Sequence, residues 1–569
     1  MPDGHSLSIE AMPDNASTRS GGQILVDALK VQGTDMAFCV PGESYLAVLD
    51  ALHDTQDTIR LVTCRQEGGA AFMAEAYGKL TGKPGICFVT RGPGATNASI
   101  GVHTAYQDST PMILFVGQVG SDFVDREAFQ EIDYRRMFGQ MTKWVASIDS
   151  AQRIPEYVNR AFQIAMSGRP GPVVLALPED MLTASATVRD TAPCQIAQPS
   201  ASSKDLRTLR SLLCNAQRPL MILGGSGWTA EACRDIQRFA EAAGLPVATA
   251  FRRQDLFDNR HPNYAGNIGL GMSRQLTERV KQADLLLVVG ARLGEATTNG
   301  YTLVDPIDAR QTLVHVHAAA EELGILYQPA LPINAAMPRF ASQLAELEDI
   351  PCGPWRQWTL DSNREYLADI EPQAQPFDVD LALIVKGLAQ ALPQDAIITN
   401  GAGNYAGWVH RYFQYKPWRT QLAPTNGAMG YGVPAAVAAK LAAPKRTVVC
   451  FAGDGCFMMN GQELATAIQH DAAVIFIVVN NGVFGTIRMH QEMHYPERPS
   501  GTQLVNPDFA ALARAYGAHG ETVTSTQDFA AAFERARSSG KAALIEVRTD
   551  VRAVTSRRTL ADLQASLPQ

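Results

Sequence analysis

The sequence predicts an α/β fold built from three doubly wound parallel-sheet domains. Short apolar runs rich in Val, Ile and Leu have the composition of strands that are buried on both faces. These runs alternate with longer segments of helical periodicity, which is typical of a parallel sheet with crossover helices. Two looser Pro-rich stretches, residues 188–203 and 351–377, divide the chain into three blocks and are expected to be linkers. The length of 569 residues agrees with about three or four domains.

The expected elements can be assigned in order along the chain. Residues 1–19 are polar and are expected to be a disordered leader without a signal-peptide core. In the first block, residues 20–187, and the second block, residues 204–350, the expected strands are residues 36–40, 59–64, 85–90, 112–117, 219–223, 245–249 and 284–289. In the third block, residues 378–551, they are residues 448–455 and 473–479, with a helix over residues 460–470 and a tail at residues 552–569. The first and third blocks are alike in outline, because in each a strand runs into a Gly-rich loop.

Composition and charge exclude several classes of protein. Hydrophobic residues make up 46% of the chain and charged residues 19%, so a sizeable core is available. A net charge of −8 argues against nucleic-acid binding, and no apolar run approaches the ~18 residues that cross a membrane. The nine cysteines contain no Cys-x-x-Cys pair and are expected to be reduced core residues. We therefore expect a cytoplasmic enzyme that acts on a small molecule.

A Gly-Asp-Gly sequence at residues 453–455 and an Asn-Asn pair at residues 480–481 each follow an apolar strand. Asp454 and Asn481 are 27 positions apart, with one helix and one strand between them. Because ligands of open parallel sheets bind at the carboxyl ends of the strands, we expect both side chains at that edge. Oxygen ligands of this kind suit Mg²⁺, which takes further ligands from water and a diphosphate. Either fragment alone would be an ordinary turn or loop, but together they predict a magnesium site.

Glu67 lies where an expected strand, residues 59–64, meets a helix that begins Gln66-Glu67-Gly68-Gly69-Ala70-Ala71. The paired small residues allow another backbone to pack closely against the start of this helix. A buried carboxyl group there acquires a raised pKa and can act as an acid. The alternative is an exposed first-turn carboxylate that the helix dipole favours. The small residues favour the catalytic interpretation.

These two motifs resemble the signature of the thiamine-diphosphate-dependent enzymes. The three blocks resemble that family's pyrimidine-binding, central Rossmann-like and diphosphate-binding domains. The resemblance implies thiamine diphosphate and Mg²⁺ as cofactors, with Asp454, Asn481 and the backbone carbonyl of Val483 as metal ligands. It implies that Glu67 protonates the aminopyrimidine of the cofactor. In this family the acid and the metal ligands come from different chains, which implies a homodimer at minimum, with a homotetramer as the alternative.

Further segments are similar to the large subunit of acetolactate synthases, namely residues 92–97, 105–111, 117–119, 128–131 and 427–432. The match implies that Met429 holds the cofactor bent, that Gly427 accepts from its amino group and that Gln118 lies near the reacting carbonyl. Phe129, Lys143 and Ile487 would line the substrate pocket. The implied cofactor-binding residues are Gly401, Ala402, Gly403, Asn404, Tyr405, Gly427, Met429, Gly453, Asp454, Gly455, Cys456 and Asn481.

The implied activity is carboligation, in which a 2-oxo acid such as pyruvate loses CO₂ and the enamine is transferred to a second carbonyl compound. Glu43 and His490, both candidate catalytic residues, leave the outcome open. Glu43 lies where decarboxylase relatives carry an acid for proton transfer, although a helix-cap carboxylate explains it equally. His490 stands where acetolactate synthases place a Trp that shapes the acceptor pocket. The alternative is therefore a non-oxidative 2-oxo acid decarboxylase or C–C lyase, while the complete set of acid and metal ligands argues against a non-catalytic regulatory subunit.

The central block raises the question of a second cofactor. Gly224-Gly225-Ser226-Gly227 and Gly290-Ala291-Arg292 are similar to loops that hold FAD in acetolactate synthases. His315-Val316-His317-Ala318 lacks the acidic residue that could bind a ribose at this point. Both FAD and a central domain without a nucleotide are compatible with the sequence.

Overall fold

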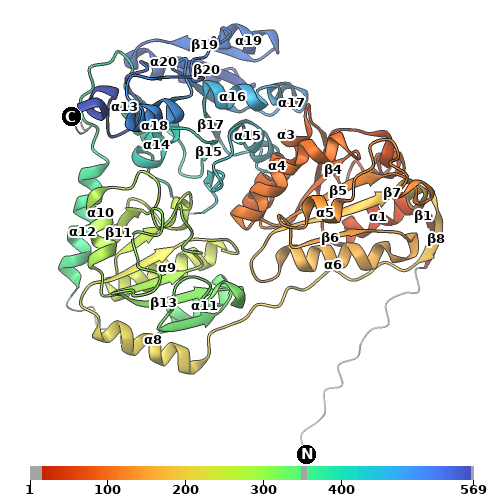
Figure 1. The fold of residues 1–569 in the computed structure, drawn as a ribbon, viewed down its shortest axis with the longest axis horizontal. Coiled ribbons are helices and arrows are strands. Elements are labelled where there is room, and N and C mark those ends of the chain that lie inside the picture. The colour runs from red at the N-terminus through yellow and green to blue at the C-terminus, as the bar shows by residue number, and fades with distance from the viewer. Residues whose placement is uncertain (1–15, 348–354, 417, 566–569) are drawn as a thin grey trace, which may run out of the picture.

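The computed structural model describes residues 16–347, 355–416 and 418–565 and contains three six-stranded parallel sheets. The sheets form three lobes, with the first domain in red and orange, the central domain in yellow and green, and the third in teal and blue (Figure 1). Along β4 (Gly85–Val89), alternate side chains enter two different apolar clusters, so helices cover both faces of the sheet. The predicted α/β fold with three doubly wound sheets is confirmed.

The first and third sheets have the same topology. Numbered within its own domain, each has the strand order 2-1-3-4-6-5. The first sheet runs β3 (Arg60–Thr63), β2 (Met36–Cys39), β4, β5 (Met112–Gln118), β7 (Pro172–Pro178) and β6 (Trp144–Ser147). The third runs β16 (Gln421–Leu422), β15 (Ile397–Asn400), β17 (Val448–Gly453), β18 (Ile475–Asn480), β20 (Ala543–Arg548) and β19 (His519–Val523). The likeness expected between the two blocks is therefore a likeness of strand order.

The central sheet has the Rossmann order 3-2-1-4-5-6. Its strands are β11 (Tyr264–Asn267), β10 (Val247–Thr249), β9 (Pro219–Leu223), β12 (Leu285–Val289), β13 (Thr312–His317) and β14 (Leu331–Asn334). The helices of this domain include α8 (Ser203–Asn215), α9 (Ala230–Ala243), α10 (Arg274–Gln282) and α11 (Met337–Ala345). The Rossmann-like central domain is thus present as expected.

The helices of the two outer domains complete the layers. In the first domain they are α1 (Gly21–Val31), α2 (Leu46–His53), α3 (Glu67–Thr81), α4 (Pro93–Asp108), α5 (Tyr134–Phe138), α6 (Ile154–Met166) and α7 (Glu179–Thr183). In the third they are α13 (Leu381–Ala391), α14 (Tyr405–Tyr412), α15 (Gly432–Ala442), α16 (Asp454–Asn460), α17 (Glu463–Gln469), α18 (Gly485–His494), α19 (Phe509–Ala515), α20 (Thr526–Ser538) and α21 (Leu560–Ala565). The helix expected over residues 460–470 is therefore α17, and α16 precedes it.

One apolar cluster is continuous between the first and third domains, because α3 packs against α15. Phe72 on α3 meets the ring of Tyr431, just before α15, edge to face at a centroid distance of 5.4 Å. The small residues at the start of α3 permit close packing, since a Cβ on Gly69 would lie 2.4 Å from a carboxylate oxygen of Glu463 on α17. The domain that carries Glu67 and the domain that carries Asp454 are therefore packed together within one chain.

Two expectations need correction, one about the leader and one about the second linker, and the predicted tail contains a helix. The leader lies outside the described residues over residues 1–15, but Ser17–Ser20 form β1, which pairs antiparallel with β8 (Ser185–Val188). The second linker contains α12 (Arg356–Asp369), which packs on the central domain and is anchored by the buried Trp355 donating to the carbonyl of Ala243. The tail contains α21, which packs against α18. Long-range packing, which composition does not reveal, orders these segments.

None of the helices within the described ranges combines the length and apolar character needed to cross a membrane.

Candidate active site

The crevice of the third sheet lies between β15 and β17, where the strand order reverses. Ligands of open α/β sheets bind at the carboxyl ends of the strands at such a switch point. Residues 401–405 leave β15 there, and Asp454 leaves β17 as the first residue of α16. Asn481 follows β18, which pairs in parallel with β17 so that Gly453 lies opposite Val479. The sheet brings the predicted diphosphate loop and both predicted metal ligands to one edge.

Asp454 is 3% exposed, and its carboxylate accepts hydrogen bonds from N–H groups. Its Oδ1 accepts from the amide of Gly455 at 2.9 Å. Its Oδ2 accepts from the amide of Gly482 at 2.9 Å and from Asn506 Nδ2 at 2.8 Å. Burial raises the pKa of Asp454, and these donors offset the shift only in part. No ion pair joins it to a Lys, Arg or His in the part of the chain that the structure describes, and a buried carboxylate without a cation partner fits a divalent metal ion.

Asn481 and Val483 form the turn that follows β18. Asn481 Oδ1 accepts from the amide of Val483 at 3.2 Å, and Val483 forms an antiparallel bridge with Gln503. The described segments contain no group of three or more His, Cys, Asp and Glu side chains that could hold a metal ion. The candidate ligands therefore provide one charge, from Asp454, together with amide and backbone carbonyl oxygens. Such a set suits Mg²⁺, which keeps coordination positions for water and phosphate.

The loop of residues 401–405 packs against the thiol of Cys456. Tyr405 Oη accepts from the amide of Gly401 at 3.0 Å and donates to Cys456 Sγ at 3.3 Å. The thiol also accepts from the amide of Gly430 at 3.2 Å, and burial raises its pKa. Cys456 thus joins the predicted diphosphate loop to the predicted wedge segment, residues 427–430.

Gly453 and Gly455 leave room for the rings that face them. A Cβ on Gly453 would lie 2.8 Å from the ring of Tyr405, and one on Gly455 would lie 2.5 Å from the ring of Phe484. Any larger residue at either position would displace an aromatic ring from the crevice. The sequence motif therefore has a steric basis here in addition to its expected contact with phosphate.

Within the wedge segment, Gly427 is exposed and Met429 is half-buried against the apolar cluster of the third domain. Gly427 has φ of 71°, a left-handed conformation that glycine adopts without strain. The wedge segment therefore has the exposed backbone of Gly427 and the flexible side chain of Met429 near the crevice of the third sheet.

Glu67 is the first residue of α3 and is half-buried at the edge of the first sheet. Its Oε2 accepts a 2.9 Å hydrogen bond from Asn97 Nδ2 on α4. Glu463 of the third domain holds the start of the helix, because its fully buried carboxylate accepts from the amides of Arg65 and Gln66. Burial raises the pKa of Glu463. No described hydrogen bond within one chain connects Glu67 to the predicted metal ligands.

Comparisons with known proteins agree with this geometry. Sequence models of thiamine pyrophosphate enzymes match in order: the N-terminal TPP binding domain at residues 19–137, the central domain at 206–344 and the C-terminal TPP binding domain at 401–547. The acetolactate synthase isozyme 2 large subunit of Escherichia coli K12 is 32% identical over 541 residues, which cover 93% of this chain and 96% of that protein. This chain belongs to the thiamine pyrophosphate enzyme family.

Two further relatives have the same kind of name. The acetolactate synthase large subunit of Lactococcus lactis subsp. lactis is 33% identical over 508 residues, covering 88% of this chain and 87% of that protein. The probable acetolactate synthase large subunit of Methanocaldococcus jannaschii is 30% identical over 548 residues, covering 93% and 92%. The predicted resemblance to acetolactate synthase large subunits is confirmed.

In this thiamine pyrophosphate enzyme, Arg91 joins predicted substrate-site residues at the edge of the first sheet. Its Nε donates to the carbonyl of Phe129 at 3.2 Å, and its guanidinium lies 3.6 Å from the carboxylate of Glu43. The same guanidinium pairs with Glu179. The side chains of Phe129 and Glu43 are exposed, so both face the space outside this chain.

The loop between β5 and α5 is strained next to this edge. Asp125, Glu127 and Gln130 have φ of 62°, 54° and 66°, which non-glycine residues rarely adopt. Gln118 holds the loop by donating from Nε2 to the carbonyl of Ile132 at 2.9 Å. Strained backbone of this kind clusters at functional sites. Gln118, a predicted site residue, therefore holds a loop whose backbone is strained.

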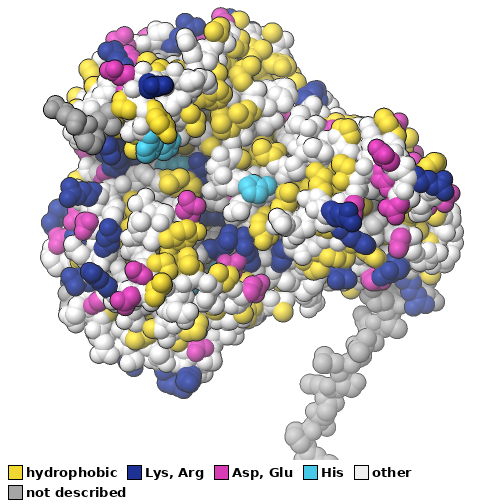
Figure 2. Space-filling model, viewed as in Figure 1, with side chains coloured by type: hydrophobic (Ala, Val, Ile, Leu, Met, Phe, Trp, Pro, Cys, Tyr) yellow, Lys and Arg dark blue, Asp and Glu magenta, His cyan; other side chains and the backbone are white. Residues whose placement is uncertain are grey.

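Lys143 lines a cavity at the edge of the first domain, and its expected place beside Phe129 in the substrate pocket stays a prediction. Lys143 Nζ donates to the carbonyl of Ser167 at 2.6 Å, and burial lowers the pKa of Lys143 to about 8. A cavity of about 560 Å³ lies between the first and central domains, and Figure 2 shows Lys and Arg side chains gathered in the hollow between these lobes. Residues lining this cavity include Tyr106, Lys143, Arg169, Arg292, His315 and Glu322. Lys143 lines this cavity because the first and central domains pack against each other. A local sequence pattern cannot reveal such packing.

Two loops of the central domain, residues 224–227 and 290–292, approach each other closely. A Cβ on Gly225 would lie 1.9 Å from the carbonyl oxygen of Gly290, so the two predicted flavin loops touch each other. Glu322 binds Arg169 at 2.9 Å and Arg292 at 3.2 Å. Both arginines are thus paired with one carboxylate, and FAD at these loops stays a prediction.

Helix α18 presents Ile487 and His490 on one exposed face, since they are three positions apart. Its opposite face is anchored by the fully buried Glu492. Asn404 accepts a 3.0 Å hydrogen bond from Thr486 and so ties this helix to the 401–405 loop. The exposed face therefore has a fixed orientation relative to the crevice.

Several residues of the site escape prediction from the sequence. Asn506 binds Asp454 from a loop 52 positions away and follows no motif. Asn97 lies within a family-like segment, but nothing in the sequence indicates its hydrogen bond to Glu67. Glu463 could have been noticed as a lone acid in an otherwise apolar helical stretch.

Proposed function

We propose that the protein is a thiamine diphosphate- and Mg²⁺-dependent carboligase that decarboxylates a 2-oxo acid such as pyruvate and joins the remaining fragment to a second carbonyl compound. The main support is the position of the buried Asp454 and of Asn481 after two neighbouring strands, at the carboxyl edge of the third sheet. The 32% identity to an acetolactate synthase large subunit supports the type of reaction. When bound, thiamine diphosphate supplies a nucleophilic carbon and an electron sink.

The residues of this chain would bind and orient the cofactor. Asp454, Asn481 and the carbonyl of Val483 would hold Mg²⁺, and the 401–405 loop would face the diphosphate. Glu67 would hold a proton at the aminopyrimidine ring, which is the acid–base work suited to a positioned carboxyl group. Its support is the half-buried position at the start of α3 and the fixed helix start behind it.

We propose a homodimer as the smallest active unit. Glu67 and Asp454 lie at the edges of different sheets, and no hydrogen bond among the described residues connects them. A second copy would place the acid of one chain over the metal site of the other. The exposed side chains of Phe129 and Ile487 would then line a substrate pocket between the copies.

The second candidate is a non-oxidative 2-oxo acid decarboxylase or C–C lyase. The observation that favours it is the carboxylate of Glu43 at the switch point of the first sheet, next to Arg91. An acid there could deliver a proton to the reacting carbon and release an aldehyde. Gln118 at the end of β5 and His490 on α18 would influence the same choice.

The test supplies the purified protein with thiamine diphosphate, Mg²⁺ and pyruvate and separates acetolactate from acetaldehyde. We expect acetolactate as the main product; acetaldehyde alone would favour the lyase. Asp454→Ala and Asn481→Ala should lose bound cofactor on desalting while remaining folded, because Mg²⁺ is expected to anchor the diphosphate. Asn215→Ala is the matched control, since its side chain donates to the carbonyl of Ser211 on α8 of the central domain. Normal cofactor retention in both site variants would refute the metal assignment.

A further inference from the structure

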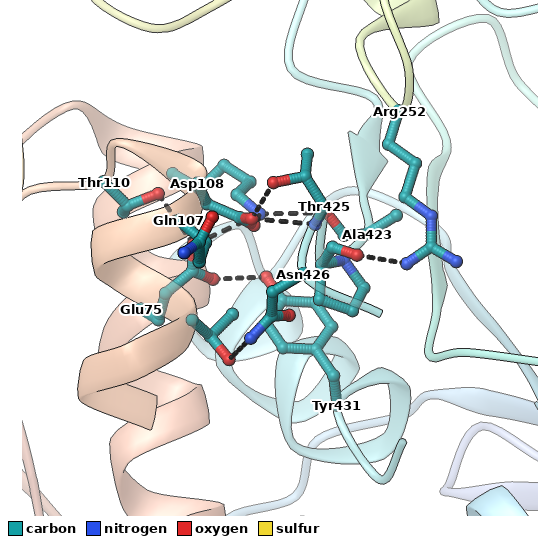
Figure 3. Close-up of polar contacts among 12 residues, drawn as sticks. Glu75, Gln107, Asp108, Thr110, Arg252, Ala423, Thr425, Asn426 and Tyr431 are labelled. Atoms are coloured by element: carbon teal, nitrogen blue, oxygen red, sulfur yellow. Dashed lines mark hydrogen bonds and ion pairs between the residues drawn. The ribbon is translucent and has the colours of Figure 1, made fainter. Parts of the chain in front are cut away.

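A buried ionic cluster lies between the first and third domains. It consists of Glu75 and Lys79 on α3, Asp108 at the end of α4, and the hydroxyl of Tyr431. Lys79 Nζ lies 3.1 Å from Glu75 and also pairs with Asp108. The side chains of Glu75 and Asp108 are 0% exposed, and that of Lys79 is 4% exposed. Figure 3 shows Glu75 and Asp108 on two helices, facing Thr425 and Tyr431.

Stability alone does not account for this cluster. Two carboxylates share one ammonium group, and apolar residues of similar size can often replace a buried ion pair without loss of stability. The carboxylates are satisfied by hydroxyl donors: Tyr431 donates to Glu75 at 2.5 Å, and Thr110 donates to it at 2.7 Å. Burial raises the pKa of Glu75. The hydrogen bonds of the cluster instead hold particular residues of the third domain against α3 and α4.

The groups held by the cluster belong to one loop, residues 423–431, which we call the wedge loop. Lys79 donates to the carbonyl of Ala423 at 3.0 Å. Asp108 accepts from the amide of Thr425 at 2.7 Å and from its hydroxyl. At the other end of the loop, Tyr431 donates to Glu75. Both ends of the loop are therefore fixed to the first domain.

The residues between these two anchors are the ones expected to contact the cofactor. Gly427 is exposed, Met429 is half-buried, and both lie between Thr425 and Tyr431. Asn426 adds a third anchor by donating to Thr104 on α4 at 2.9 Å. Small shifts of the anchors would therefore move the backbone and side chain that face the crevice.

The central domain contributes to the same loop. Arg252 is 7% exposed, has φ of 59° and donates to the carbonyl of Pro424. Arg253 donates to the backbone carbonyl of Asp108 at 2.9 Å. A strained and buried arginine from the central domain thus holds the loop that the ionic cluster holds from the first domain.

We propose that the buried ionic cluster positions the wedge loop for catalysis, with Tyr431 and Thr425 as positioning residues that act through Gly427 and Met429. This inference rests on the proposed function of the site. The metal end of the cofactor would be bound elsewhere, by Asp454 and Asn481. Loss of an anchor should therefore affect activation of the cofactor more than its affinity.

The test compares Tyr431→Phe and Thr425→Val, each of which removes one hydroxyl and nearly preserves shape. The matched control is Tyr77→Phe: Tyr77 is also a buried tyrosine whose hydroxyl donates to a carboxylate, that of Asp35, which lies outside the wedge loop. All three changes remove one hydroxyl–carboxylate hydrogen bond. A general loss of stability would therefore appear in all three variants alike.

Two measurements decide the question. In cofactor-free protein, amide hydrogen exchange of residues 423–431 should be about tenfold faster in both loop variants, the effect of roughly one lost hydrogen bond. With thiamine diphosphate and Mg²⁺, exchange of the cofactor C2 proton and kcat should fall about tenfold, while the Kd of the cofactor and KM change less than about threefold. Tyr77→Phe should change none of these quantities.

Unchanged amide exchange in both loop variants, or equal changes in Tyr77→Phe, would overturn the inference. So would a loss of cofactor affinity that is as large as the loss of C2 exchange. If the unmodified protein binds no thiamine diphosphate, the proposed function fails. The amide exchange of the cofactor-free protein still decides whether the cluster holds the loop.

Discussion

Replacement of Glu67 by Gln separates the catalytic interpretation of this residue from the structural one. The amide oxygen of Gln can still accept the 2.9 Å hydrogen bond from Asn97, so the local fold should persist. The structural loss is the interaction of a first-turn carboxylate with the helix dipole, about 0.3–1 kcal/mol. The catalytic loss is that of one positioned proton-transfer group, a factor on the order of 10² to 10⁴. This factor corresponds to about 3–5 kcal/mol, which is well above the structural loss.

The assay measures kcat, urea unfolding and the exchange of the C2 proton of bound thiamine diphosphate, followed by NMR after acid quenching. We expect kcat and C2 exchange to fall together while cofactor retention and unfolding change little. Glu156→Gln is the matched control, since Glu156 is also a first-turn carboxylate, on α6, and it pairs with Arg153, which is not a predicted site residue. If C2 exchange in Glu67→Gln matches that of the unmodified protein, Glu67 is only a helix-start carboxylate.

Three further predictions concern product choice, acceptor choice and pH. Glu43→Gln should raise the ratio of acetolactate to acetaldehyde if Glu43 delivers a proton to the reacting carbon. His490→Trp should shift acceptor preference toward small 2-oxo acids by ~1–3 kcal/mol; an unchanged product ratio in both variants would contradict these roles. Burial lowers the pKa of Lys143 from 10.5 to about 8, so between these pH values the unfolded chain binds more protons and stability rises with pH. Lys143→Met should remove this rise. In urea unfolding, the variant should exceed the unmodified protein in free energy of unfolding by the largest amount below pH 8. A difference between the two proteins that stays constant from pH 7 to 10.5 would refute the burial of this ammonium group.

The meeting of Asp454 and Asn481 at one edge of the third sheet could be predicted because each residue belongs to a local strand-to-loop pattern. Asp454 and Asn481 each follow a strand, and the two strands are consecutive neighbours in a parallel sheet. Strand-to-loop patterns therefore placed both side chains at one edge without knowledge of the whole fold. The same logic placed Glu67 at the start of α3.

Features that depend on contacts between distant segments could not be predicted. Lys143 lies in a cavity whose other wall is the central domain, so its surroundings depend on how two domains pack. Helix α12 lies in a stretch whose Pro-rich flanks indicate a linker, and it is stabilised by burial of Trp355 against the central domain. The pairing of Ser17 with Val188 joins segments that no local pattern relates.

The separation of Glu67 from Asp454 has a genetic consequence. If each site takes its acid from one copy and its metal ligands from the other, a mixed dimer of Glu67→Gln and Asp454→Ala chains has one site in which both residues are native. The other site of that dimer carries both defects. Two alleles that each encode an inactive protein would therefore complement each other when one cell expresses both. The activity of this protein would then be a property of the pair of alleles that a cell expresses.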